Sequence, residues 1–316
     1  MILVLTGGVG GAKLVLGLAR RLEPGSLTVV VNTGDDFDHL GLRICPDLDT
    51  VMYTLAGLAN PETGWGLSGD SWGFMEALQR LGGDDWFRLG DRDLATHVER
   101  THRLRRGEAL SAITAGFCAS LDVTHTVVPM SDDPVRTMVR SSGRRIDFQD
   151  YLVRLRAEPV VEGFDYEGIQ HARPYEGFLT ALQDPQLRAI IVCNSNPFVS
   201  ILPIVALPGI RERLSRRRAP LIAVSPIVGG AAVKGPLAKM LGELGRDASP
   251  VAIAEIYAGL LDGMVIDRTD DGLREAIAAL DVQPFIAETI MTTEHEKIRL
   301  ADEVLRAIGT LGGDYG

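Results

Sequence analysis

One stretch of the chain decides the fold: Leu27-Thr28-Val29-Val30-Val31-Asn32-Thr33-Gly34-Asp35-Asp36. Its first five residues form an apolar, largely β-branched run that predicts a buried strand, and the run stops abruptly at a polar turn. In open α/β sheets, ligands bind in the crevice beyond the carboxyl ends of the strands. The adjacent carboxylates of Asp35 and Asp36 therefore put negative charge where a ligand is expected.

A glycine-rich turn near the N-terminus predicts a phosphate-binding loop. The apolar run Met1–Leu5 predicts a strand, and Thr6-Gly7-Gly8-Val9-Gly10-Gly11-Ala12-Lys13 leads from it into a segment with helical spacing of leucines. Glycines let the backbone approach a phosphate closely, and a helix N-terminus offers free N–H groups. The loop residues expected to contact phosphate are Gly8, Gly10, Gly11 and Lys13.

This loop matches no complete nucleotide-binding motif. Gly8 and Gly10 fit the start of GxGxxG, but Lys13 stands where the last glycine belongs. Leu14 follows the lysine at the position where a P-loop has Ser or Thr for magnesium. A tight strand–helix turn without a ligand is the alternative, and the density of glycines favours phosphate contact over it.

A second acidic pair, Asp47 and Asp49, opens the next predicted helix near Pro46. Taken alone, Asp47 is typical of an N-cap and Asp49 of a first-turn acid that the helix dipole favours. Together with the first acidic pair and the phosphate loop, they indicate Mg²⁺, which prefers hard oxygen ligands beside phosphate. His39, between the two pairs, is either a ligand contact or a loop histidine.

The composition is that of a soluble globular protein, with 316 residues, 46% hydrophobic and 23% charged. A net charge of -10 argues against nucleic-acid binding, because neutralising phosphates requires a basic face. The sequence has no apolar run of the ~18 residues that a membrane span needs. Three cysteines without CxxC spacing argue against disulfides and structural zinc, and we expect a cytoplasmic protein.

The middle of the chain breaks the alternation of strands and helices. A helical, loop-rich pattern with Trp65, Trp72 and Trp86 is followed by a hairpin around Ser141-Ser142-Gly143. We therefore predict an insertion over residues 61–175 that covers the active site, and a nucleotide-binding core formed by 1–60 and 176–316. The tryptophans are either an aromatic wall for a flat ligand or ordinary core residues.

The alternation resumes with predicted strands at Leu187–Cys193 and Leu221–Val224, each followed by a polar turn. These turns supply further candidate ligand contacts: Ser195, Asn196, Pro197, Ser225, Pro226 and Ile227. The alternative is that strand–helix turns are generally rich in such residues. The predicted fold is α/β, with a Rossmann-like, mostly parallel sheet, helices on both faces, and a helical and β-hairpin insertion.

Seven motifs occur in a fixed order along nearly the whole chain: Leu5–Lys13, Val31–Asp36, Cys45–Thr50, Leu89–His97, Ser195–Pro197, Ser225–Ile227 and Leu261–Gly263. Together they resemble the 2-phospho-L-lactate transferase family of coenzyme F420 biosynthesis. The resemblance implies transfer of a phospholactyl or phosphoenolpyruvyl group from a guanosine-diphospho donor to the ribityl hydroxyl of the deazaflavin FO, with release of GMP. It also implies a Rossmann-like core, dependence on Mg²⁺ and a homodimer.

The resemblance also suggests roles for the candidate residues. Asp35 is expected to bind the metal with Asp49 as a second ligand, and Asp36 or a neighbouring carboxylate to orient or deprotonate the hydroxyl. The predicted catalytic residues are Asp35, Asp36 and Asp49. The remaining predicted substrate contacts are the glycine loop with Lys13, Asn32, His39, Asp47, Ser195–Pro197 and Ser225–Ile227. The sequence leaves open the donor, lactyl or enolpyruvyl, and the number of metal ions.

Two other functions compete with this one. A regulatory protein of the gluconeogenesis-factor type shares the glycine loop and a comparable acidic turn but binds uridine-diphospho sugars without transfer. The stretches Pro46–Thr50 and Gly90–His97 favour the transferase. A nucleotide-dependent oxidoreductase is disfavoured, because no acidic ribose contact follows a complete GxGxxG at the usual spacing.

Overall fold

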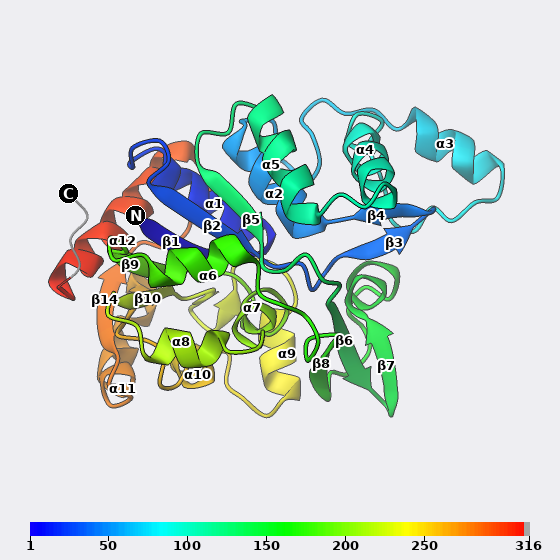
Figure 1. The fold of residues 1–316 in the computed structure, drawn as a ribbon. Helices are drawn as coiled ribbons and strands as arrows, with labels where there is room; N and C mark the ends of the chain where they lie inside the picture. Colours follow the sequence, from blue (N-terminus) through cyan, green and yellow to red (C-terminus); the bar gives the residue numbers. More distant parts are fainter. Residues whose placement is uncertain (313–316) are drawn as a thin grey trace.

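A parallel sheet of seven strands forms the centre of residues 1–312, the part of the chain that the computed structural model describes (Figure 1). Its strands are β1 (Ile2–Thr6), β2 (Leu27–Val31), β5 (Thr126–Pro129), β9 (Ala189–Val192), β10 (Leu221–Val224), β13 (Gly263–Asp267) and β14 (Gln283–Ala287). They lie in the order β14-β13-β10-β9-β1-β2-β5, and every neighbouring pair is parallel. The predicted α/β class with a Rossmann-like sheet is confirmed.

Helices cover both faces of the sheet, because successive strand residues point to opposite sides and both sets are apolar. Leu3 and Leu5 belong to one buried cluster and Ile2 and Val4 to the other. The face of Ile2 packs against α1 (Gly8–Ala19), α2 (Pro46–Leu55), α5 (Leu110–Ser120) and α12 (Glu294–Thr310). The face of Leu3 packs against α6 (Glu176–Gln183), α7 (Leu202–Val205), α8 (Ile210–Ser215), α9 (Leu237–Glu243), α10 (Pro250–Ile256) and α11 (Arg274–Ala278).

The strand order reverses between β1 and β9. From β1 the sheet grows through β2 to β5 on one side, and from β9 it grows through β10 and β13 to β14 on the other. Ligands of open α/β sheets bind at such a switch point, beyond the carboxyl ends of the strands. The turns after β1, β2, β9 and β10 all reach this edge, as the candidate site requires.

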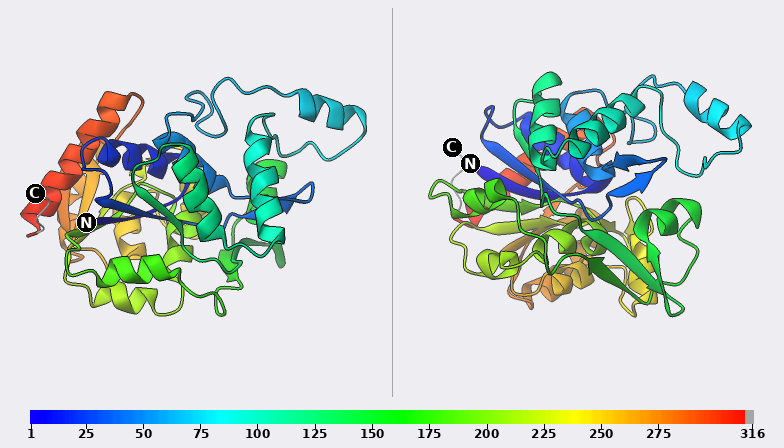
Figure 2. Two further views of the ribbon diagram at one scale, coloured as in Figure 1. Left: turned by 45° about the horizontal axis from the view of Figure 1, so that its top comes forward. Right: turned by 45° about the vertical axis from the view of Figure 1, so that its right-hand side comes forward.

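Smaller elements surround this edge. They are the hairpin β3 (Phe37–His39) and β4 (Leu42–Ile44), α3 (Gly73–Arg80), α4 (Asp93–Arg105), the sheet β7-β6-β8 (Arg144–Asp147, Arg136–Ser141 and Gly163–Glu167), a π-helix (Asp150–Arg154), and the hairpin β11 (Ile227–Val228) and β12 (Ala231–Ala232). In both views of Figure 2, α3 extends away from the sheet.

Short strands account for the main differences from the sequence prediction. Residues 37–44 form the β3–β4 hairpin, where Phe37 and Ile44 pair and pack with Met75 and Leu89. Three-residue strands are too short to show a period of two, so the sequence did not indicate them. The hairpin of β6 and β7 also gains a third strand, β8, from a segment without clear alternation.

The predicted insertion over residues 61–175 contains one strand of the central sheet. Strand β5, at Thr126–Pro129, lies within this range and pairs with β2 as the edge strand. The sheet is therefore not confined to residues 1–60 and 176–316. The division into domains stays a prediction with this correction.

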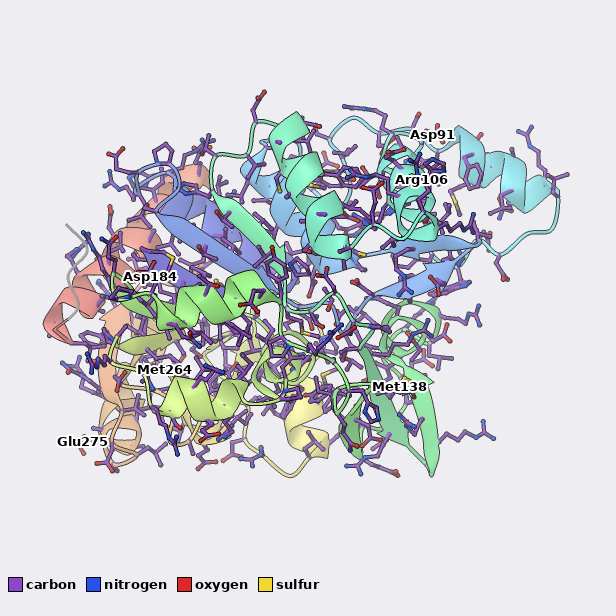
Figure 3. The ribbon with its side chains drawn as sticks, in the orientation of Figure 1. Asp91, Arg106, Met138, Asp184, Met264 and Glu275 are labelled. Carbon is purple, nitrogen blue, oxygen red and sulfur yellow. The ribbon has the colours of Figure 1, made fainter. Side chains whose placement is uncertain are left out.

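Asp91 ties α3 to the start of α4. Its carboxylate accepts hydrogen bonds from the Ser71 hydroxyl at 2.6 Å and from the backbone N–H groups of Gly73 and Phe74 at 2.9 and 2.8 Å. Asp91 lies in the loop that precedes α4 (Figure 3). A residue eighteen positions away in sequence thus supplies the N-terminal cap of α3.

The C-terminal helix α12 begins with a capping box, in which Thr293 and Glu296 exchange hydrogen bonds. Within residues 1–312, no helix has both the length and the apolar character needed to cross a membrane.

We predict that Gly17→Ala destabilises the fold. A Cβ atom at Gly17 of α1 would collide with the backbone of Lys297 in α12, which cannot rotate away as a side chain could. The free energy of unfolding in urea should fall by about 1–3 kcal/mol. The control is Gly242→Ala in α9, where a Cβ atom meets nothing within 4 Å and stability should rise by about 0.5–1 kcal/mol. Equal stability of Gly17→Ala and the wild type would contradict the close helix contact.

Candidate active site

A cavity of about 570 Å³ lies at the edge of the sheet where β1, β2, β9 and β10 end. Gly8 and Gly10 enter it from the turn after β1, and Asp35 from the turn after β2. The turn after β9 contributes Ser195, and that after β10 contributes Pro226. The cavity therefore occupies the switch point, where ligands of this fold class bind.

Asn32, a predicted substrate contact, is fully buried and does not line the cavity, but it holds together two carboxylates that do. Its side-chain Nδ2 donates to Asp35 Oδ1 at 2.8 Å and to Asp47 Oδ2 at 2.9 Å. Its Oδ1 accepts the backbone N–H of Gly34 at 2.9 Å. Every polar group of the amide is thus used, and its orientation is fixed. Asp35 and Asp47 are both buried, and both line the cavity.

Asp47 also links this pair to the glycine-rich loop. Its Oδ1 accepts the backbone N–H of Gly8 at 2.7 Å, at the N-terminus of α1. Asp47 belongs to the first turn of α2, but no side chain caps the N-terminus of that helix. Asp47 therefore binds the N-terminus of α1. It does not cap α2, the helix to which it belongs, as the alternative interpretation of the sequence had it.

Ionising both carboxyl groups of this pair is unfavourable, because they are buried and close together. Burial, followed by the charge of Asp47, raises the pKa of Asp35 well above its usual range. Burial raises the pKa of Asp47 to about 6, although the hydrogen bonds from Asn32 and Gly8 oppose the shift. Two neighbouring buried carboxylates favour the binding of a cation or a proton.

Asp49 is paired differently. Its carboxylate forms a bidentate ion pair with Arg100, whose Nη1 donates to Oδ2 at 3.0 Å while Nη2 donates to Oδ1. The side chain of Arg100 is only 2% exposed. Burial acts against its charge, but the carboxylate of Asp49 keeps the pKa of Arg100 above its usual value. The structure thus joins Asp35 to Asp47, and it joins Asp49 to a buried arginine.

Three further side chains, none of them a predicted site residue, complete this side of the cavity. His97 Nε2 lies 3.2 Å from Asp93 Oδ2, and its Nδ1 lies 3.7 Å from Asp49 Oδ2. The Tyr53 hydroxyl donates to Asp93 Oδ1 at 2.7 Å. Tyr53, Asp93 and His97 all line the cavity. Their detectable signal was the i,i+4 spacing of Asp93 and His97, which puts both on one face of α4.

Asp36 is buried next to Asp35 but is not among the residues that line the cavity. Its carboxyl group is hydrogen-bonded with the thiol of Cys45. Burial raises the pKa of Asp36 to about 7, although this hydrogen bond and the charge of Arg100 act in the opposite direction.

Half of the predicted glycine-loop contacts reach the cavity. Gly8 and Gly10 line it, and Gly8 has a φ of 68°, which favours glycine. Gly11 instead packs closely against Thr6 and Ser195, leaving no room for a Cβ atom. Lys13 lies in α1 with its Nζ donating to the Met291 carbonyl at 2.9 Å, and it is not a lining residue.

A hydrogen bond joins the turn after β9 to the turn after β1. The Ser195 hydroxyl donates to the Gly7 carbonyl at 2.7 Å, and Asn196 accepts the backbone N–H of Phe198 at 3.0 Å. Ser195 and Asn196 line the cavity together with Asn194, which the sequence prediction omitted. Pro197 opens the helix that Asn196 caps and does not line the cavity.

In the turn after β10, Pro226 alone of the three predicted residues lines the cavity. The Ser225 hydroxyl donates to the Ile227 carbonyl at 3.0 Å and accepts the Ile227 N–H at 3.1 Å. Ser225 and Ile227 are both buried and shape the turn.

Of the three predicted tryptophans and His39, some line the cavity and others do not. Trp65 and Trp86 line the cavity, whereas the ring of Trp72 packs under Arg88, 4.1 Å from the guanidinium carbon. His39 is buried with its ring centroid 5.2 Å from that of Trp86 and does not line the cavity. Burial lowers the pKa of His39.

The carboxylate pair fits a magnesium ion that substrate helps to bind. Over residues 1–312, no three His, Cys, Asp or Glu side chains form a group that could hold a metal. Mg²⁺ at phosphate-transfer sites is bound by one or two carboxylates, with waters and substrate phosphates as the other ligands. Asp35 and Asp47 provide two hard oxygen ligands that are buried and repel each other, which suits such an ion.

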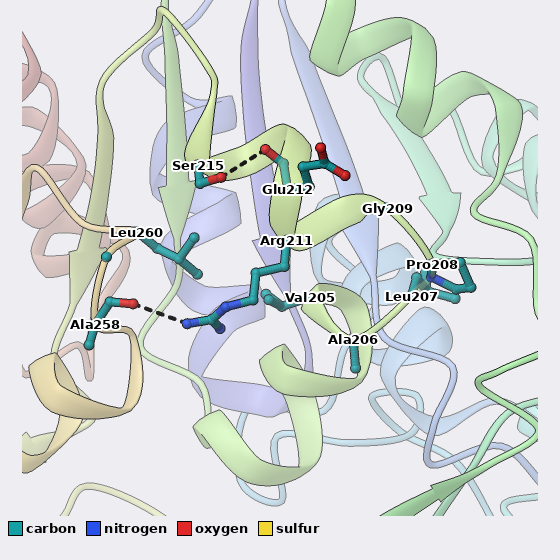
Figure 4. Close-up of a pocket in the computed structure, with 11 residues that line it drawn as sticks. Val205, Ala206, Leu207, Pro208, Gly209, Arg211, Glu212, Ser215, Ala258 and Leu260 are labelled. Atoms are coloured by element: carbon teal, nitrogen blue, oxygen red, sulfur yellow. Dashed lines mark hydrogen bonds between the residues drawn. The ribbon is translucent and has the colours of Figure 1, made fainter.

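A second hollow, of about 710 Å³, lies elsewhere on the molecule (Figure 4). It is lined by α7, α8 and the loop before β13, where Arg211 donates to the Ala258 carbonyl at 3.0 Å. Although it is larger, it takes no residue from the strand-end turns. The chemistry described above belongs to the smaller cavity.

The fold and the position of the cavity together define a class, the α/β proteins with a Rossmann-like parallel sheet and a cavity at its switch point. A solved structure from Bacillus halodurans, a member of the upf0052 family, has this fold with a TM-score of 0.61, at 16% identity over 96% of this chain and 98% of its own. At that identity, the likeness shows the fold alone.

Sequence comparison gives the family. Residues 2–306 match the family described as 2-phospho-L-lactate transferase CofD. The chain is 40% identical to the phosphoenolpyruvate transferase of Streptomyces griseus over 96% of this chain and 97% of the relative. It is 36% identical to the 2-phospho-L-lactate transferase of Methanosarcina mazei, over 96% and 99%. The chain therefore belongs to the 2-phospho-L-lactate transferase CofD family. The predicted family and its transferase class are confirmed, and the regulatory alternative is not favoured.

We predict that Arg100→Met destabilises the protein severely, because it leaves the buried carboxylate of Asp49 without its partner. The free energy of unfolding should fall by about 3–5 kcal/mol. The double variant Asp49→Asn with Arg100→Met removes both charges and should recover a large part of that loss. Denaturant unfolding of the two single variants and the double variant measures the coupling. A loss below about 1 kcal/mol in Arg100→Met would contradict a buried, structurally required ion pair.

Proposed function

We propose that the protein transfers a phosphoenolpyruvyl or phospholactyl group from a guanosine-diphospho donor to the terminal ribityl hydroxyl of FO. The donor is enolpyruvyl-diphospho-5'-guanosine or lactyl-2-diphospho-5'-guanosine, and the product is dehydro-F420-0 or coenzyme F420-0. The hydroxyl oxygen forms a bond with the phosphorus that carries the organic acid. The bond from that phosphorus to the bridging oxygen breaks, and GMP leaves with this oxygen while the hydroxyl loses its proton.

The observation that carries this proposal is the carboxylate pair at the glycine-rich loop. Asp35 and Asp47 would hold Mg²⁺, which supplies neutralisation of the diphosphate charge when it is bound. Asp47 replaces Asp49 as the second metal ligand of the sequence prediction, because Arg100 already occupies Asp49. The first turn of α1, with its N-terminal N–H groups, would position the diphosphate beside the metal.

Asp49 is the carboxylate that we propose for orienting the attacking hydroxyl. It lines the cavity, whereas Asp36 does not. Arg100 fixes its direction, and an oriented carboxylate can accept the hydrogen bond of a hydroxyl. With this assignment, Asp36 does not contact the substrate and instead supports its neighbours in the acidic turn.

The aromatic side of the cavity is proposed to hold the flat ring system of FO. Trp86, Phe87 and Phe148 line this side, and Arg154 of the π-helix lies over the Trp86 ring at 4.6 Å. Aromatic side chains suit a planar ligand because ring stacking adds to the burial of apolar area. The turns after β9 and β10 are proposed to hold the guanosine part.

The protein is further proposed to act in the cytoplasm as a homodimer. Its three cysteines are free and buried, which agrees with a reducing compartment. The dimer stays a prediction from the family resemblance and is tested by light scattering after size-exclusion chromatography.

We predict that the enolpyruvyl donor is the better substrate. Identity is 40% to the phosphoenolpyruvate transferase of Streptomyces griseus and 36% to the 2-phospho-L-lactate transferase of Methanosarcina mazei. Incubation with FO, Mg²⁺ and either donor, with GMP and the phosphodiester product measured by mass spectrometry, gives the comparison. Turnover with neither donor, together with tight binding of a uridine-diphospho sugar, would contradict the transferase function.

We predict that Asp35→Asn lowers turnover by about 100-fold or more, because it removes a charged metal ligand. Stability should stay equal or increase, since the variant also removes one of two repelling buried charges. The matched control is Asp38→Asn on β3, whose carboxylate is 54% exposed and should not affect turnover. Rates are measured over a Mg²⁺ titration, beside unfolding curves. A nearly normal rate for Asp35→Asn would remove this residue from the metal site.

A further inference from the structure

Lys234 is a cation in the candidate active site that neither the glycine-loop motif nor the acidic motif includes. It lies between the β11–β12 hairpin and α9, in a segment whose residues Val233 to Leu237 all line the cavity. The same cavity holds Gly8, Gly10 and the Asp35–Asp47 pair. The lysine therefore lines the same cavity as the proposed metal ligands and the phosphate loop.

Backbone hydrogen bonds hold this segment in place. The N–H of Gly229, in the hairpin turn, donates to the Asp270 carboxylate at 3.1–3.2 Å. The N–H of Val233 donates to the Pro226 carbonyl at 3.2 Å. Because none of these bonds involves the Lys234 side chain, its removal should leave the segment where it is.

The ammonium group of Lys234 lies close to Gly64, which in turn lies close to Val9 of the glycine-rich loop. Its Nζ donates to the carbonyl of Thr63 at 2.7 Å. The neighbouring residue, Gly64, is in close contact with both sides: a Cβ atom there would lie 3.0 Å from Lys234 Nζ and 2.5 Å from Val9 Cγ1. One glycine thus separates the lysine from a residue of the phosphate loop. Gly64 also has a φ of 77°, so a larger residue would be strained as well as crowded.

The charge of Lys234 is not compensated by protein in the described part of the chain. Among residues 1–312, no Asp or Glu forms an ion pair with Lys234, and its hydrogen-bond partner is a neutral carbonyl. Burial, and then the charge of Lys13, lower its pKa. An ammonium group has three N–H donors, and the bond to Thr63 uses one. Two donors of this exposed cation therefore remain for an anion.

We propose that Lys234 binds the diphosphate of the donor and neutralises the charge that the departing GMP phosphate acquires. This inference depends on the proposed function for the identity of the nucleotide. Lys234 and the N-terminus of α1 form the positive side of the site, and Asp35 and Asp47 form the side that binds the metal. The lysine that the sequence motif emphasises, Lys13, instead donates to the Met291 carbonyl outside the cavity lining.

Binding measurements with three probes test this role without requiring turnover. Isothermal titration calorimetry with Mg²⁺ compares GDP, inorganic pyrophosphate and guanosine. In Lys234→Met we expect the affinities for GDP and pyrophosphate to fall about tenfold or more, because a charge-assisted hydrogen bond is lost. Guanosine should bind within about twofold of wild type, since it has no phosphate. Lys234→Arg keeps the charge and should recover part of the loss. The matched control, Lys297→Met, removes a lysine of α12 outside the cavity and should change nothing.

The outcomes separate this inference from the proposed function. Binding of GDP and pyrophosphate by Lys234→Met within about twofold of wild type would overturn the inference, and so would an equal loss for guanosine, which indicates a general distortion. If the wild type binds pyrophosphate through Lys234 but not GDP, the inference stands and the guanosine donor is wrong. If the wild type binds neither anion, both are wrong.

Discussion

The amide of Asn32 is the group on which the rest of the site depends. Two buried carboxylates would repel each other, yet Nδ2 of one side chain donates to Asp35 and to Asp47 at 2.8 and 2.9 Å. Asn32 follows directly from β2, so the sheet fixes this amide, and Asp47 in turn ties α2 to the N-terminus of α1 at Gly8. An unmade hydrogen bond here would leave buried charge unsatisfied, which is costly. A strand, two helices and a loop are thus aligned by one side chain.

Around this amide, the charged groups of the site have different partners. The two acids bridged by Asn32 face the phosphate loop, Arg100 neutralises Asp49, and Lys234 brings a positive charge without a carboxylate partner in the described chain. A net charge of -10 describes the whole surface and does not describe this cavity. The aromatic residues around Trp86 form a further, less polar side. With the carboxylate pair as the proposed metal-binding side, Lys234 as the proposed anion-binding side and an aromatic side, the cavity matches the three parts of the proposed reaction.

Local patterns predicted much of the fold, because a buried parallel strand and an amphipathic helix each leave their own period in the sequence. Strands β1, β2, β9 and β10 were recognised in this way. The β3–β4 hairpin was not, since three-residue strands show no period, and β5 was placed in an insertion because helices without intervening strands precede it. The structure also adds Tyr53, Asp93 and His97 to the cavity. Their contacts join α2 to α4, through Tyr53 with Asp93 and His97 with Asp49, and no local spacing encodes a contact between two helices.

By itself, the sequence determined the α/β class, the glycine-rich turn, the acidic turn after β2 and the resemblance to a transferase family, because all of these are properties of contiguous residues. Only the tertiary structure decided which charges meet. Asp47 joins Asp35, whereas Asp49 joins Arg100, although the two aspartates are only two positions apart, because helix positions i and i+2 point about 200° apart. Likewise Lys13 lies on α1 outside the cavity lining, whereas Lys234 lines the cavity from the segment that follows the β11–β12 hairpin. Side-chain direction and long-range packing make these choices, and neither is visible in residue order alone.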